Sequence, residues 1–174
     1  MKKKIGLFYG TDTGYTEISA TQIVEQLGSS FVDVLEISDV TVDTFKNYEY
    51  LILGLSTWYN GELQSDWDDF FEDFKTIDFS GKKVAIFGLG DQYGYSDTFI
   101  DGVGIIGEVV VENGGKLIGQ WSTDGYDFDE SIAVFEKGFF CGLAIDEDNQ
   151  PDLSEKRIKM WSTQISHEFG LILD

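Results

Sequence analysis

Short apolar runs alternate with helical patterns along almost the whole chain, and this alternation sets the fold class. Residues 5–9, 50–55 and 83–88 contain such runs, which are typical of strands covered by helices on both faces. Parallel strands need long crossover connections, and these are usually helices. The sequence therefore predicts an α/β fold in which a parallel sheet lies between two layers of helices, a three-layer αβα arrangement.

Five strands are expected, in the doubly wound order 2-1-3-4-5, within a single domain that spans residues 1–174. They are residues 5–9, 31–37, 50–55, 83–88 and a fifth strand that begins at 116–119 and resumes at 139–144. The segment between the two parts of the fifth strand, residues 120–138, is polar and rich in Gly and Asp, and it has no clear period.

Helical patterns fill the connections between the expected strands. They cover residues 16–27, 42–46, 66–74, 98–113 and 152–173. In the first of them, Ile18 falls on the apolar face. Gly114 and Gly115 end the helix at 98–113. In the last helix, which follows Pro151, Ser154 is a candidate N-cap.

The chain is strongly acidic, with 32 Asp and Glu residues against 12 Lys and Arg and a net charge of −20. Nucleic acids and anionic membranes bind positively charged surfaces, so neither is expected as a partner. The acidity serves either solubility or steering toward basic protein partners, and composition does not separate the two.

Cys141 is the only cysteine and His167 the only histidine of the chain. A disulfide within the chain and a cysteine-ligated metal site are therefore excluded, and catalytic triads and histidine metal sites are poorly supplied. We expect Cys141 to be a buried structural thiol and His167 to lie on the surface. The basic start is followed by only five apolar residues, and no apolar run approaches a membrane span, so a soluble, cytoplasmic protein is expected.

Three loops are expected to meet where the winding of the sheet reverses, between its first and third strands. Ligands of doubly wound sheets bind in this crevice, beyond the carboxyl ends of the strands. Residues 10–16 follow the first strand, residues 56–61 the third and residues 89–95 the fourth. Any functional residues on these loops should therefore face one site.

The first loop, residues 10–16, reads Gly-Thr-Asp-Thr-Gly-Tyr-Thr and leads directly into a helix. Free N–H groups and a helix N-terminus favour an anion, and here three threonine hydroxyls add donors without any Lys or Arg. The loop is neither a Walker A sequence nor the Gly-x-Gly-x-x-Gly of dinucleotide sites. It is either a cradle for a monophosphate or simply a helix start capped by threonine.

Aromatic residues stand out in the other two loops. Trp58 and Tyr59 lie in the second loop, and Tyr93 and Tyr95 lie on either side of Gly94 in the third. By itself, the large aromatic of the second loop is either a lid over a planar ring or a plug of the core. Glycine allows the backbone to approach a ring edge closely, and aromatic faces stack on planar rings. Next to a phosphate cradle, they indicate a ligand made of a phosphate, a spacer and a flat heterocycle, a description that fits FMN.

These loops, with two further segments, closely resemble the long-chain flavodoxins along essentially the whole chain. The resemblance is carried by residues 10–16, 56–58, 61–67, 88–92, 94–95, 121–128 and 142–150. The irregular segment 120–138 is similar to the insertion that splits the fifth strand in that group. The resemblance implies a flavodoxin-like fold and one non-covalently bound FMN.

The resemblance also assigns roles to the residues of the three loops. It implies that Trp58 and Tyr95 stack on opposite faces of the flavin ring. The FMN-binding residues that it implies are, for the phosphate, Thr11, Asp12, Thr13, Gly14, Tyr15 and Thr16, and, for the rest of the cofactor, Ser56, Thr57, Trp58, Tyr59, Asn60, Gly61, Leu89, Gly90, Asp91 and Tyr95. Tyr15, Tyr93 and Asn60 depart from the pattern that is common in the cyanobacterial members.

The implied activity is electron transfer rather than catalysis. A flavodoxin is a low-potential one-electron carrier that shuttles between semiquinone and hydroquinone and substitutes for ferredoxin. Its implied partners are basic redox proteins such as ferredoxin–NADP reductase, photosystem I or another oxidoreductase, and the protein is expected to be a monomer. Because Asn and Gly tolerate positive φ, we expect Asn60-Gly61 to ease rotation of the peptide that joins Tyr59 to Asn60.

Two other classes of protein share this topology. An FMN-dependent quinone or NAD(P)H reductase would need a second substrate site, yet the chain has few cations for an NADPH phosphate. A receiver-type signalling domain would need an acidic pair after the first strand, where this chain has Tyr9-Gly10-Thr11. An NADPH oxidation assay separates the first alternative, and a yellow colour on purification excludes the second.

Overall fold

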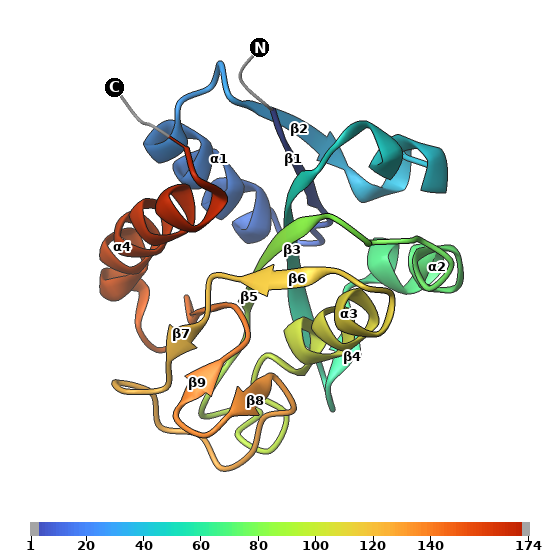
Figure 1. The fold of residues 1–174 in the computed structure, drawn as a ribbon. Helices are drawn as coiled ribbons and strands as arrows, with labels where there is room; N and C mark the ends of the chain where they lie inside the picture. The colour runs from blue at the N-terminus through green and yellow to red at the C-terminus, as the bar shows by residue number, and fades with distance from the viewer. Residues whose placement is uncertain (1–3, 172–174) are drawn as a thin grey trace.

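The computed structural model describes residues 4–171 as a central parallel sheet between two layers of helices (Figure 1). The strands of this sheet are β1 (Ile5–Tyr9), β2 (Val32–Glu36), β3 (Tyr50–Trp58), β5 (Lys83–Leu89), β6 (Lys116–Ile118) and β10 (Leu143–Ile145), and β4 (Glu62–Leu63) pairs with the end of β3. The helices are α1 (Tyr15–Leu27), α2 (Ser65–Phe74), α3 (Asp101–Glu112) and α4 (Pro151–Phe169), with two short 3-10 helices, η1 (Ile37–Asp39) and η2 (Val42–Asn47). The predicted three-layer α/β architecture is confirmed.

The strand order across the sheet is β2-β1-β3-β5-β10, with all of these pairs parallel. Counted as five strands, this is the predicted order 2-1-3-4-5. The fifth strand is split, because β6 pairs with residues 83–85 of β5 and β10 pairs with residues 87–89. The carboxyl ends of β1, β3 and β5 therefore lie side by side, and the three loops that follow these strands start from the same edge of the sheet.

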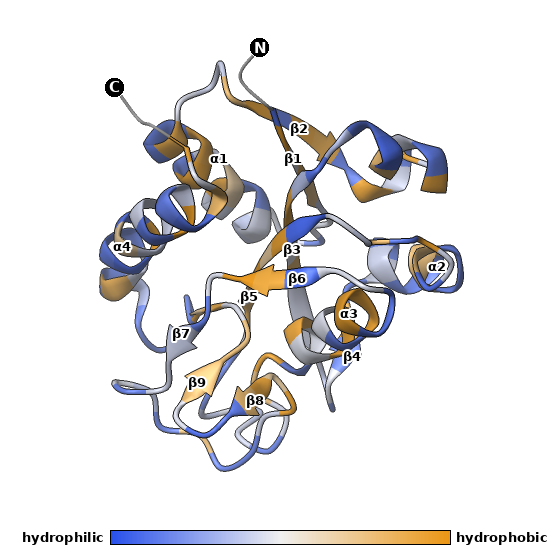
Figure 2. Cartoon of the chain, viewed as in Figure 1, coloured by the Kyte–Doolittle hydropathy of each residue, from blue (hydrophilic) through white to orange (hydrophobic). Residues whose placement is uncertain are grey.

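Two hydrophobic cores fill the space between the sheet and its helices. Successive strand residues such as Leu7 and Phe8 point to opposite faces, so each strand contributes to both cores. One core lies against α2 and α3, and the other against α1 and α4, which pack together. Figure 2 shows hydrophobic residues concentrated along the central strands, whereas the helices carry both kinds of residue.

The segment between β6 and β10 is more regular than its sequence indicates. It forms β7 (Trp121–Ser122), β8 (Val134–Glu136) and β9 (Phe139–Phe140), an antiparallel sheet in the order β7-β9-β8. The expectation of one strand over 139–144 was wrong, because Phe139 and Phe140 pair within this small sheet and only residues 143–145 join the main one. Gly142 makes the crossing between the two sheets, where a Cβ would collide with the carbonyl of Ile86.

Several expected helix boundaries and faces are corrected by the structure. Helix α3 begins at Asp101 rather than at residue 98, because Ile100 adopts a left-handed backbone with φ 48°. Helix α4 begins at Pro151 with Gln150 as N-cap, so Ser154 is not a cap but a buried residue of the first turn. The helix ends at Phe169, before a left-handed Gly170, and not at residue 173, which lies outside the described residues. Ile18 is 54% exposed instead of buried.

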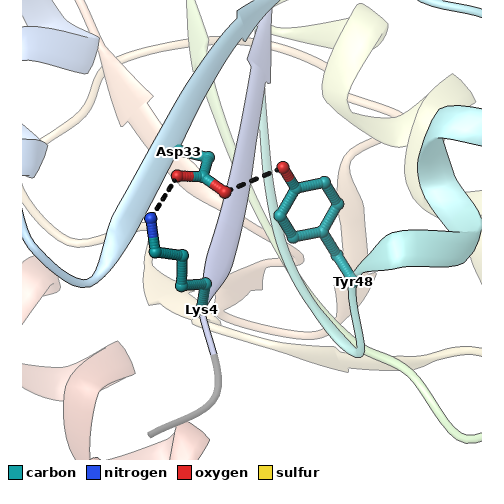
Figure 3. Close-up of polar contacts among 3 residues, drawn as sticks. All are labelled: Lys4, Asp33 and Tyr48. Atoms are coloured by element: carbon teal, nitrogen blue, oxygen red, sulfur yellow. Dashed lines mark hydrogen bonds and ion pairs between the residues drawn. The ribbon is translucent and has the colours of Figure 1, made fainter. Parts of the chain in front are cut away.

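A polar cluster ties the open edge of the sheet to the segment that follows η2 (Figure 3). Lys4 Nζ donates to Asp33 Oδ1 at 2.8 Å, and Tyr48 Oη donates to Asp33 Oδ2 at 2.9 Å. The hydrogen bond from Lys4 lowers the pKa of the Asp33 carboxyl. Burial, followed by the bond to Asp33, raises the pKa of Tyr48 to about 12. Charged groups on an edge strand also discourage pairing with another chain.

Candidate functional site

A cavity of about 340 Å³ lies at the carboxyl ends of β1, β3 and β5, where the three loops meet. Threonine hydroxyls occur in the first loop, and aromatic residues in all three. The residues that line the cavity are Thr13, Tyr15, Thr16, Ser56, Thr57, Trp58, Tyr59, Leu89, Gly90, Asp91, Tyr95, Glu147 and Asp148. The crevice predicted at the reversal of winding is therefore present.

The first loop is a tight turn that places the N-terminus of α1 against the cavity. Thr11 Oγ1 accepts a hydrogen bond from the Gly14 amide at 2.9 Å, and Gly14 caps the helix in a left-handed conformation with φ 91°. Thr13, Tyr15 and Thr16 line the cavity beyond this cap. The turn therefore presents hydroxyls and the start of a helix to any ligand, which favours an anionic group.

Three residues expected at the phosphate do not line the cavity: Thr11, Asp12 and Gly14. Thr11 and Gly14 close the turn on each other. Asp12 Oδ1 accepts hydrogen bonds from Gln64 Nε2 at 3.0 Å and from Ser65 Oγ at 2.7 Å, so it anchors the turn to the start of α2. These three residues therefore stabilise the turn and do not line the cavity.

Gln64 is a supporting residue that the sequence reasoning missed. It is fully buried, and its Oε1 accepts the amide of Trp67, which caps α2. It also packs against Gly10, where a Cβ would collide with Gln64 Oε1. A glutamine just before an amphipathic helix carries no distinctive signal, so only the fold identifies this role.

The second loop is a hairpin rather than a free loop, because β3 extends to Trp58 and pairs with β4. Trp58 Nε1 donates to Ser56 Oγ at 2.8 Å, which fixes the indole beside the cavity. Thr57 Oγ1 accepts the amide of Gly102 at 2.9 Å and so ties the hairpin to α3. Ser56 thus fixes the indole of Trp58, and Thr57 fixes the hairpin that carries it.

Left-handed backbone conformations lie on both sides of Asn60 at the tip of the hairpin. Positive φ angles occur at Tyr59, with 46°, and at Gly61, with 84°, and not at Asn60. Neither Asn60 nor Gly61 lines the cavity, whereas Tyr59 does. The carbonyl of Tyr59 accepts a hydrogen bond of 3.4 Å from Thr98 Oγ1. Tyr59 and Gly61 therefore carry the left-handed backbone in this conformation, and the easing of peptide rotation by Asn60-Gly61 stays a prediction.

The third loop is organised by Asp91. Its Oδ1 accepts the amides of Tyr93 at 3.1 Å and Gly94 at 2.7 Å, and its carbonyl accepts the amide of Tyr95 at 3.0 Å. Burial raises the pKa of the Asp91 carboxyl, but hydrogen bonds from Gly94, Asn149 and Tyr93 outweigh it and the net pKa is lowered. Tyr95 lines the cavity from this turn, in a loop other than that of Trp58.

Glu147 and Asp148 also line the cavity, and they were not among the expected site residues. They follow β10, whose position next to β5 brings them to this end of the sheet. Burial, then the charges of Asp91, Asp146 and Glu147, raise the pKa of the Asp148 carboxyl. The acidic run at residues 146–148 is visible in the sequence. Its place at the cavity could not be predicted, because it depends on the pairing of β10 with β5.

One part of the cavity therefore presents hydroxyls and a helix N-terminus, which favour an anion, and another part presents aromatic side chains and carboxylates. Of the residues that the structure describes, no Lys, Arg or His lines it. An anion held here would be bound by hydroxyls, amides and the helix dipole. A planar ring would lie near Trp58 and Tyr95 and close to the carboxylates of Asp91, Glu147 and Asp148.

The two residues singled out for their rarity lie away from this chemistry. Cys141 is buried, and burial raises the pKa of its thiol to about 12, so it stays protonated. His167 is exposed on α4. Within residues 4–171, no cluster of acidic, histidine or cysteine side chains forms a metal site, and no helix is long and apolar enough to span a membrane.

Fold and site together define an α/β protein of the mononucleotide-binding class, with its ligand cavity at the reversal of winding. The sequence matches the Flavodoxin family over residues 7–161, so the chain belongs to the flavodoxin family. A flavodoxin of Nostoc sp. is 52% identical over 171 residues, which cover 98% of this chain and 100% of the relative. Flavodoxin 1 of Escherichia coli is 45% identical, covering 95% of this chain and 94% of the relative.

Solved structures agree with this assignment. A Fusobacterium nucleatum flavodoxin bound to flavin mononucleotide superposes with a TM-score of 0.90 at 37% identity, covering 95% of this chain and 98% of that chain. These matches confirm the resemblance to long-chain flavodoxins and the flavodoxin-like fold. They also confirm that the chain is an electron-transfer protein rather than an enzyme.

Proposed function

We propose that this chain binds one FMN non-covalently in the cavity and carries electrons one at a time between redox partners. The observation that carries this proposal is the meeting of a hydroxyl-lined helix start with Trp58 and Tyr95 at one cavity. The Fusobacterium nucleatum flavodoxin of the same fold is bound to flavin mononucleotide, which supports it. When bound, the flavin supplies the one-electron chemistry.

Each loop has a separate task in this proposal. Thr13 and Thr16, with the amides at the start of α1, bind the phosphate. Trp58 and Tyr95 stack on the ring, and the backbone around Tyr59 and residues 89–91 contacts its edge. Thr11, Asp12 and Gly14 support the phosphate turn through the hydrogen bonds of the structure.

The charge around the cavity favours a low potential, because reduction adds negative charge beside existing carboxylates. One carboxylate at ~10 Å with an effective dielectric of ~40 costs on the order of 0.8 kcal/mol. For one electron this is roughly 35 mV. Asp91, Glu147 and Asp148 line the cavity, and no cation lines it among the described residues. We propose on this basis that the protein substitutes for ferredoxin as a low-potential carrier.

The partners proposed for this carrier are basic oxidoreductases such as ferredoxin–NADP reductase or photosystem I. A surface with a net charge of −20 attracts such proteins and repels nucleic acids. The exposed aromatic residues Tyr59 and Tyr95 at the cavity provide apolar contact area. A monomer suffices for this role, because one chain supplies all three loops.

The phosphate assignment is tested with Thr16→Val, which removes the hydroxyl of a buried cavity residue and keeps its shape. We expect FMN to bind at least about tenfold more weakly, and riboflavin, which lacks the phosphate, to bind as before. Thr21→Val is the matched control, because Thr21 is an exposed residue of the same helix that bonds only to the Glu17 carbonyl. An equal loss for both ligands, or none for FMN, would contradict the assignment.

The reductase alternative is tested with the same purified protein. A reductase site for NADPH would need a cation for its phosphate, and among residues 4–171 no Lys or Arg lines the cavity. We expect no steady-state oxidation of NADPH by the FMN-loaded protein alone. Turnover without an added reductase would contradict the carrier function.

A further inference from the structure

Gln92 is the one buried residue between residues 90 and 98, in the loop that carries Asp91 and Tyr95. Its neighbours Tyr93 and Tyr95 are exposed, so side-chain packing does little to hold this loop in place. A buried amide must be hydrogen-bonded to be stable. Ser96 ties the far end of this loop to residues 129 and 130 through its carbonyl and its hydroxyl, and the bonds of Gln92 are the buried connection in the middle of the loop, next to Asp91.

The first of these connections leads to Asp146, which is also fully buried. Asp146 Oδ2 accepts two hydrogen bonds from Gln92, one from the backbone amide at 3.1 Å and one from the side-chain Nε2 at 2.7 Å. Asn149 donates to the same carboxylate from its backbone amide and from its side chain. Asn149 Nδ2 also donates to Asp91 Oδ1 at 2.8 Å, so the loop after β10 holds the third loop at two adjacent residues.

The second connection leads to the segment between β6 and β10. Gln92 Oε1 accepts the amide of Asp127 at 2.6 Å. Gln92 Nε2 also donates to Gln150 Oε1, while Gln150 Nε2 donates to the carbonyl of Gly125. One side chain thus joins three segments that lie far apart in the sequence.

We propose that Gln92 is a positioning residue: its bonds to Asp146 and Asp127 set where residues 89–95 hold Tyr95 and the Gly90–Asp91 backbone against the flavin ring. This inference rests on the proposed function. Through Gln92, the loop after β10 and the segment after β6 would then influence the affinity for the flavin and its potential, although neither segment contacts the phosphate. Small displacements of positioned groups have large effects, so a well-satisfied buried network is suited to this task.

The central test is a swap of donor and acceptor between the two side chains. Gln92→Glu removes the Nε2 donor and places a second carboxylate against Asp146, so the loop must move. All contacts of the Asp146 carboxylate come from N–H donors of Gln92 and Asn149, so Asp146→Asn leaves one oxygen for two sets of donors and turns an NH2 group toward one of them. The double variant Gln92→Glu with Asp146→Asn restores a donor–acceptor pair with the wild-type net charge. Gln26→Glu, an exposed change at the far end of α1, is the matched control for charge.

The readouts are the dissociation constants of FMN and riboflavin, the visible circular dichroism of the bound flavin and its reduction potentials. We expect both single variants to bind FMN and riboflavin at least about tenfold more weakly, which is ~1.4 kcal/mol, and to change the flavin spectrum. The double variant should recover part of this loss, because it restores the bond between the two side chains but not the bond from the backbone amide of residue 92. Gln26→Glu should change none of the readouts.

Asp146→Asn separates positioning from simple charge repulsion. If Asp146 acted only through its charge, its removal would tighten the binding of anionic FMN and leave riboflavin nearly unchanged. Tighter or unchanged FMN binding therefore overturns the proposal. So does a double variant that stays as weak as the singles, or a loss of thermal stability with wild-type affinity, spectrum and potentials. Asp146→Asn keeps one acceptor oxygen and remains informative if Gln92→Glu does not fold.

The wild-type protein distinguishes failure of this inference from failure of the proposed function. If the wild type binds neither FMN nor riboflavin, the proposed function fails. If it binds both and the Gln92 and Asp146 variants match it, the flavin site stands and only the positioning role is wrong.

Discussion

At the scale of single residues, Asp101 shows how burial shapes charge near the site. Asp101 lies in the first turn of α3 and is 7% exposed, and its Oδ1 accepts the amide of Ile132 at 3.0 Å. A helix N-terminus favours a negative charge. Burial nevertheless raises the pKa of Asp101, and the charge of Glu130 acts in the same direction. The charged form is therefore less favourable in the folded protein than in the unfolded chain.

Asp101→Asn is expected to stabilise the protein at neutral pH, because it removes the buried charge and keeps an oxygen for the Ile132 amide. The gain should be ~1 kcal/mol, about 2–4 °C in the thermal midpoint. The folded-state pKa is raised, so the penalty exists above that pKa and disappears as the pH falls through it. Melting curves of both proteins from pH 7 to pH 4 should therefore converge. A gap that widens toward acid would contradict this.

At the scale of elements, Gln64 couples the phosphate turn to α2. It caps the helix through Trp67 and donates to Asp12 in the turn. Trp67 in turn donates from Nε1 to the carbonyl of Gly54 in β3, at 2.9 Å. The start of α2 thereby holds the turn that precedes α1.

Gln64→Leu should lower the free energy of unfolding by about 1–3 kcal/mol, because it removes the helix cap and leaves the buried Trp67 amide without its acceptor. Urea denaturation of the apoprotein measures this directly. Gln26→Leu, at an exposed position of α1, is the matched control and should change the value by less than about 0.5 kcal/mol. Equal effects of the two substitutions would show that the cap contributes nothing.

The elements differ in how far local sequence determines them. The long apolar runs of β1, β3 and β5 place their strands to within a few residues, because burial on both faces leaves few alternatives. The start of α3 was not predictable, since the left-handed backbone at Ile100 has no signal in a helix-like sequence. The split of residues 139–144 depends on the crossing at Gly142, a tertiary contact.

The site residues also divide into those that the sequence predicts and those that depend on tertiary contacts. Topology brought the three loops together, and eleven of the expected residues line one cavity. Glu147 and Asp148 could not be placed, because their position depends on how β10 pairs with β5. The hydrogen bonds of Gln64 and Gln92 could not be predicted either, because the sequence does not distinguish a buried glutamine from an exposed one.

At the scale of the whole molecule, the acidic surface continues up to the cavity. Asp66, Asp68 and Asp69 lie in the first two turns of α2, close to the loops, and the cavity wall itself carries Asp91, Glu147 and Asp148. A site built this way disfavours further negative charge within it and attracts positive charge from outside. The same charge distribution thus favours both the proposed low potential and the proposed basic partners.

Salt should therefore change electron-transfer rates in a direction set by the charge of the acceptor. With the reduced FMN-loaded protein and cytochrome c, a basic acceptor, the second-order rate should fall as ionic strength rises above ~0.1 M, because screening shortens the reach of the attraction. With ferricyanide, an anion, the rate should rise instead. Stopped-flow measurements on one preparation give both slopes. Rates for both acceptors that do not depend on salt would mean that the net charge of −20 serves solubility and plays no part in steering.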